Sequence, residues 1–219
     1  MSGELAPGDS LPGERKLSEV LQANRGGVRE ALKRLVQAGL VTTQHGGSTR
    51  VLDYRKTGTL DLIRQMMDSQ GELRKPALRS TLELRKILVP EAARLAALRG
   101  TPELVDRLRK HLEHTRAAVD TPLRFRSLLF EFWEIVAEGS GNIALLLALN
   151  TVREVFEQTS HGIASFPIVS LRDIDDLEAV TFAIEARDGE RAREIALRRY
   201  EAVELMIRKQ AREVRPESA

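Results

Sequence analysis

The sequence predicts a mainly α-helical chain in two parts, a small glycine-rich part followed by an all-α antiparallel helical bundle. Eight of the 15 glycines lie within the first 47 residues, and short β-like runs occur only around residues 40–52. From residue 60 onward apolar residues recur with helical spacing. A polar connector at residues 53–58 separates the glycine-rich part from the helical part. We therefore expect one domain over residues 1–56 and a second over 57–219.

The first part is expected to contain two short helices joined by a tight turn. Leucine and valine side chains share one face of a helix over residues 14–22. In a second helix, apolar residues recur at i, i+3, i+4, i+7 and i+8 starting from Val28. Asn24 is a suitable N-cap for this helix, and Gly39 suits the left-handed position that ends it.

A hairpin and a basic stripe complete this part. The runs at residues 40–44 and 49–52 flank a glycine-rich turn, so the whole arrangement predicts a winged helix-turn-helix. On the second helix Arg25, Arg29 and Lys33 recur every four residues, opposite the apolar face. A helix in the major groove needs such a face to offer guanidinium groups to phosphates and guanine. The stripe alone fits solvated helix positions equally well, but the adjoining hairpin favours DNA.

Charge and composition exclude several classes of protein and point to one kind of partner. With 42% hydrophobic and 30% charged residues, the chain is neither disordered nor membrane-spanning. The absence of cysteine excludes disulfides, thiol nucleophiles and thiolate metal sites. No signal peptide is visible, so we expect a cytoplasmic protein. The first 56 residues carry a net charge of +3 and the other 163 carry −1, which indicates an anionic partner for the first part, with nucleic acid first in line.

The second part is expected to form a bundle that could enclose a ligand. Seven helical segments are expected near residues 60–68, 77–99, 102–119, 122–138, 143–158, 171–187 and 189–213. Pro90 should kink or break the second of them. The apolar excess at residues 143–149 exceeds what one helix face can bury, so part of it is expected to line a homodimer interface.

Catalytic chemistry is sparse, and no enzyme activity is expected. His111 and His114 lie three residues apart on a helix, and we interpret them as solvated because no third metal ligand stands out. The sequence has no glycine-rich phosphate loop, no nucleophile elbow and no zinc-protease motif.

The first part resembles the DNA-binding domain of GntR-family bacterial transcriptional regulators. The resemblance is carried by residues 11–18, 24–25, 28–32, 35, 38–41 and 46–47. The turn at residues 44–46, with 49–51 after it, is similar to the fatty-acid regulator branch. Only about six residues precede the turn at Pro7, so the family's first helix is expected to be missing. The resemblance implies that operator DNA is contacted by Arg15, Asn24, Arg25, Arg29, His45 and Gly46.

The second part resembles the effector-binding domain of the FadR branch of the same family. The similar segments are residues 84–86, 91–97, 138–142 and 183–188. Many members bind a metal there through one aspartate and three histidines. In this sequence the corresponding positions are Leu129, Trp133, Leu177 and either Arg199 or Tyr200. None of these is the expected ligand, so we expect neither a metal nor another cofactor.

The residues at these positions suggest an organic effector instead. Apolar side chains combined with arginine and tyrosine suit an amphiphile such as an acyl-CoA, or another organic anion. The expected effector pocket comprises Arg85, Leu129, Trp133, Leu177, Arg199 and Tyr200. The alternative is that the apolar members simply fill the core and no effector binds.

The resemblance and the residues together predict a transcriptional regulator that binds double-stranded operator DNA and responds to a small-molecule effector. A homodimer is expected because the operators bound by such DNA-binding domains are usually palindromic. The alternative function is a small-molecule-binding or enzymatic helical protein whose N-terminal domain no longer binds DNA.

Overall fold

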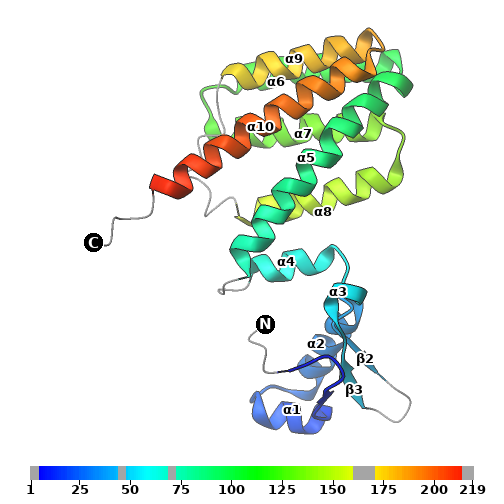
Figure 1. Cartoon of the computed structure of the whole chain (residues 1–219), viewed down its shortest axis with the longest axis vertical. Helices are drawn as coiled ribbons and strands as arrows, with labels where there is room; N and C mark the ends of the chain where they lie inside the picture. The colour runs from blue at the N-terminus through cyan, green and yellow to red at the C-terminus, as the bar shows by residue number, and fades with distance from the viewer. Residues whose placement is uncertain (1–4, 44–47, 69–72, 160–170, 214–219) are drawn as a thin grey trace. The chain divides into compact units, whose positions relative to one another are not determined.

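The computed structural model describes residues 5–43, 48–68, 73–159 and 171–213. Over these residues the chain is mostly helical, with three short strands near the N-terminus, which confirms the expected fold class (Figure 1). Contacts divide the chain into two compact units, Met1–Arg74 and Lys75–Ala219.

The first unit contains the winged helix-turn-helix. Helices α1 (Glu14–Val20) and α2 (Arg25–Gln37) pack on each other, and strands β2 (Val41–Thr43) and β3 (Thr49–Val51) pair antiparallel. A third strand, β1 (Ser10–Leu11), pairs with the other edge of β3, so the sheet order is β1-β3-β2. The sequence does not predict β1, because two residues are too few to show strand alternation.

The ends of α2 form as the sequence predicts. The side-chain oxygen of Asn24 accepts a hydrogen bond from the backbone N–H of Gly27 at 2.7 Å. Gly39 has φ +70°, and a Cβ there would lie 2.1 Å from the carbonyl oxygen of Thr57. Thr57 is brought to this place by α3 (Tyr54–Thr57), a short helix within the segment expected to be a polar connector. The chain at the end of α2 therefore approaches α3 so closely at residue 39 that only glycine fits there.

Helix α4 (Asp61–Asp68) completes the first unit. It is strongly amphipathic, and its Leu62 and Met67 are buried. Val28, Ala38 and Val41 are the other buried apolar residues that the structure describes in this unit.

The second unit is an all-α bundle, as expected. Its helices are α5 (Arg74–Arg99), α6 (Pro102–Ala117), α7 (Pro122–Gly139), α8 (Ile143–Thr159), α9 (Leu171–Glu185) and α10 (Gly189–Glu213). Helix α9 packs against α6 and α10, α6 against α7, and α7 against α8. Helix α5 continues through Pro90 without a break. Each of these helices matches its expected segment to within about three residues.

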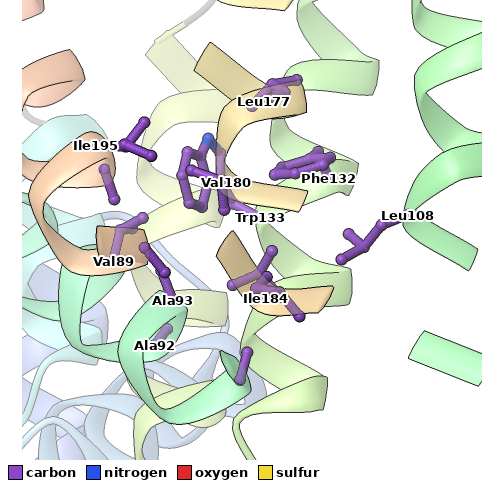
Figure 2. Packing of buried hydrophobic residues seen from close by; sticks show 14 of the residues in the cluster. Val89, Ala92, Ala93, Leu108, Phe132, Trp133, Leu177, Val180, Ile184 and Ile195 are labelled. Atoms are coloured by element: carbon purple, nitrogen blue, oxygen red, sulfur yellow. The ribbon is translucent and has the colours of Figure 1, made fainter. Parts of the chain in front are cut away.

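The core of the bundle is built from buried apolar side chains on α5 to α10, several of them alanines. Figure 2 shows part of this cluster. Phe132 and Trp133, neighbours on α7, meet edge to face with ring centroids 5.3 Å apart. Leu177 and Val180 of α9 and Ile195 of α10 are also fully buried in this cluster. No helix in the described part of the chain is both long and apolar enough to cross a membrane.

Candidate functional site

The basic stripe of α2 lies on the exposed face of the helix. Arg25, Arg29 and Lys33 are all exposed, whereas Val28 of the same helix is buried in the unit's core. The helix is therefore anchored by its apolar face and presents its cations to solvent, as a groove-binding helix must.

Arg29 is held by a carboxylate from the other helix of the motif. Its Nε and Nη2 donate to the two carboxylate oxygens of Glu14, the shortest contact being Nη2 to Oε2 at 2.9 Å. The hydrogen bond from Arg29 is the main reason why the pKa of Glu14 lies below its ordinary value. The same bond raises the pKa of Arg29.

Two of the other expected DNA contacts, Arg15 and Asn24, belong to α1 and to the N-terminal cap of α2. Arg15 is exposed on α1, with its Nε 3.9 Å from Glu19. Asn24 uses its side-chain oxygen for the helix cap, which leaves its amide N–H groups available as donors. Lys33 is 2.8 Å from Glu30 on its own helix. His45 and Gly46 lie outside the described residues.

Two of the six residues expected in the effector pocket are hydrogen-bonded to each other inside the bundle. Arg85 of α5 is buried, and its Nε donates to the hydroxyl of Tyr200 of α10 at 2.7 Å. The guanidinium carbon of Arg85 also lies 4.4 Å from the ring centroid of Phe130, which is a cation–π contact. The buried guanidinium of Arg85 on α5 therefore contacts both Phe130 of α7 and Tyr200 of α10.

Arg199 has a different environment from Arg85. Its Nη1 lies 2.6 Å from the Asp173 carboxylate, and the side chains of both residues are nearly buried. The pair ties α10 to α9. The guanidinium that was expected to receive an anionic ligand is therefore already close to a carboxylate of this chain.

Leu129, Trp133 and Leu177 are buried in the core of the bundle. Trp133 lies 6.0 Å from Tyr200 between ring centroids, and its indole N–H is buried with no hydrogen-bond partner among the described residues. Two aliphatic side chains and an indole supply no donor atom for a metal ion, so these positions do not fit the metal that the family resemblance implies. Among the described residues, no three His, Asp or Glu side chains are grouped as metal ligands.

A small cavity lies between α5, α7 and α8. It has a volume of about 10 Å³, and Arg85 and Trp133 are in its wall. Leu129, Leu177, Arg199 and Tyr200 are not part of that wall. The sequence did not point to the other lining residues, which are Phe130, Glu134, Ala137, Leu146, Leu149, Asn150 and Arg153. Helical spacing from Trp133 could have suggested Phe130 and Ala137, which lie three residues before it and four after it on the same face of α7.

The interpretation of His111 as solvated is wrong. His111 is buried, and its Nε2 lies 2.8 Å from the carbonyl oxygen of Leu128 on α7. Because a carbonyl only accepts, Nε2 is the nitrogen that carries the proton. His111 shares the packed face of α6 with Leu108 and Leu112, whereas His114 is exposed.

The fold and the exposed cations of α2 define a helix-turn-helix DNA-binding protein with a second, helical domain. The chain belongs to the gntR family of bacterial regulatory proteins, whose family model matches residues 1–51. Residues 80–202 match the FCD domain. The protein is therefore a ligand-responsive, DNA-binding transcriptional regulator. The two matches leave residues 52–79 unassigned and the compact units meet at residues 74 and 75, so the boundary expected after residue 56 stays a prediction.

Named relatives agree with this assignment. The HTH-type transcriptional regulator Mce2R of Mycobacterium tuberculosis is 36% identical over 199 residues, which cover 90% of this chain and 81% of that protein. The fatty acid metabolism regulator protein of Pectobacterium carotovorum is 30% identical over 150 residues, covering 68% and 61%. The solved structure of Streptococcus agalactiae GntR shares the fold, with a TM-score of 0.51, 24% identity and 91% of each chain covered.

Proposed function

We propose that α2 enters the major groove of operator DNA and that Arg25 and Arg29 reach base edges there. The observation that carries this proposal is that the cations of the stripe are exposed while Val28 of the same helix is buried. Arg15, the amide N–H groups of Asn24, and the hairpin residues His45 and Gly46 contact the backbone and the groove beside it. The protein acts as a regulator in the cytoplasm and catalyses no reaction.

The regulator works as a homodimer in this proposal. The exposed apolar side chains Ile143 and Leu147, at the start of α8, support an interface on this face because their exposed fractions are 68% and 57%. A palindromic operator would match the resulting two-fold axis. Replacing Leu147 with glutamate should give a monomer in light scattering at micromolar concentration, whereas the same replacement at the exposed Leu123 should not.

The effector is an organic anion with an apolar part, and long-chain acyl-CoA is the first compound to test. Buried Arg85 supplies a cation beside the aromatic rings of Phe130 and Trp133, and the fatty acid regulators are among the relatives. A cavity of about 10 Å³ holds about one water molecule, so ligand entry requires the helices around it to separate. No metal takes part in this binding.

The proposal is tested with DNA selected by the protein from a randomised duplex library. The selected duplex should bind more tightly than a shuffled duplex of the same composition, and palmitoyl-CoA should change its affinity and raise the melting temperature. Arg25→Ala should reduce the affinity for the selected duplex about ten- to a hundredfold and relax its sequence preference. Arg34→Ala removes an equal charge from the same helix outside the stripe and should weaken both duplexes equally. Failure to select any sequence would refute the operator-binding role of α2.

A further inference from the structure

The contact between Arg29 and Glu14 uses only one edge of the guanidinium. Glu14 accepts from Nε and Nη2, so the edge formed by Nη1 and the second hydrogen of Nη2 remains directed away from the carboxylate. This remaining edge carries two parallel N–H donors. It is the geometry that a guanine O6/N7 pair accepts bidentately.

The structure places Glu14 where it can aim this edge. Glu14 is the first residue of α1, and α1 packs against α2, so its carboxylate reaches Arg29 from a separate, fixed element. A bidentate contact of two planar groups also restricts the rotation of the guanidinium plane. Glu14 thus controls both the place and the direction of the free edge.

The neighbouring pair between Lys33 and Glu30 has no such effect. Both residues belong to α2, three positions apart, and they meet through a single contact of 2.8 Å. An ammonium group has no planar fork, so this contact does not define a direction for hydrogen bonding. Glu30 therefore provides a matched control: it carries the same charge, lies on the same surface and does not orient a base-reading group.

We propose that Glu14 is a specificity-determining positioning residue, which holds Arg29 so that its free edge meets a guanine of the operator. The inference rests on the proposed entry of α2 into the major groove. Pre-orientation matters because a free arginine side chain loses rotamer freedom when it binds a base, and Arg29 has lost part of it beforehand.

The carboxylate of Glu14 has two opposite effects on DNA affinity. Its charge repels phosphates and weakens binding to every sequence. Its hold on Arg29 strengthens binding only where a guanine meets the free edge. Removing Glu14 should therefore raise affinity for unrelated DNA but lower the preference for the operator, whereas simple charge removal raises both affinities together.

The experiment compares Glu14→Gln with Glu30→Gln in the full chain. The probes are the duplex selected by the wild-type protein and its shuffled counterpart, at one fixed salt concentration. Glu30→Gln should strengthen both complexes by a similar factor and leave their affinity ratio unchanged. Glu14→Gln should lower that ratio about tenfold, the scale of one well-made base contact. In an Arg29→Ala background, Glu14→Gln should leave the ratio unchanged, since Glu14 acts through Arg29.

Glu14→Asp provides a second variant that keeps the charge and shortens the side chain. It should also lower the ratio, and it decides the question if Glu14→Gln loses its helical circular dichroism. An unchanged ratio in a folded Glu14 variant would overturn the positioning role while leaving operator binding by α2 intact. A wild-type protein that does not distinguish the two duplexes would overturn the proposed DNA contact itself.

Discussion

Replacing Arg199 with alanine removes the guanidinium that lies 2.6 Å from the Asp173 carboxylate inside the helical unit. The two side chains are only 7% and 11% exposed, so solvent cannot take over the lost interaction without opening the structure. Breaking a buried ion pair by removing one partner costs about 3–5 kcal/mol. With a shift of about 2–4 °C for each kcal/mol in a domain of this size, the melting temperature should fall by about 6–20 °C.

The assay is thermal unfolding followed by circular dichroism at pH 7. Arg191→Ala is the control on the same helix, because Arg191 pairs with Glu194 in an exposed position. Exposed pairs contribute about 0–1 kcal/mol, so the control should melt within a few degrees of the wild type. Combining Arg199→Ala with Asp173→Ala should cost less than the sum of the two single changes. Equal melting temperatures for Arg199→Ala and the control would refute the buried pair.

Three further predictions concern other parts of the chain. Gly39→Ala should lower the stability of the first unit, measured by urea unfolding, because its Cβ would meet the Thr57 carbonyl at 2.1 Å, whereas Gly13→Ala, in open space, should not. Burial raises the pKa of Asp176 above its ordinary value, so its ionised form opposes folding as pH rises. Asp176→Asn should therefore melt higher than the wild type at pH 7, with the difference vanishing below the ordinary aspartate range. Neither zinc nor EDTA should change the melting temperature of the wild type, and a zinc-induced rise that disappears on mutating ligands near Trp133 would contradict the expected absence of a metal site.

The helices were predictable because their signals are local. Asn24 caps α2 through the N–H of Gly27, three residues away, and Asn142 caps α8 through the N–H of Leu145. Such contacts depend on neighbours in the sequence and survive in any fold that keeps the helix. Pro90 shows the limit of a local signal, since packing of α5 in the core overrides its tendency to break a helix.

The pairings that form the candidate sites were not predictable, because they join distant residues. Arg85 meets Tyr200 across 115 positions, and Glu14 meets Arg29 across 15. Strand β1 likewise exists only because Ser10 pairs with Arg50 of β3. Residue type showed that arginines were present in both domains, but only the packing of helices decides which partners they have.

The two domains use arginine under opposite conditions of hydration, and this difference decides what each arginine can bind. Arg29 lies at the surface, so a phosphate or a base replaces water with little loss. Arg199 is desolvated and lies next to Asp173, so an anionic effector would have to compete with a carboxylate that is already in place. The Nε of Arg85 is bonded to the neutral hydroxyl of Tyr200, which is a weaker competitor for that donor than a charged group. Tyr200→Phe removes this competing hydroxyl from the Nε of Arg85 and should therefore tighten the binding of an anionic effector, whereas Asp173→Asn should lower the melting temperature of the bundle.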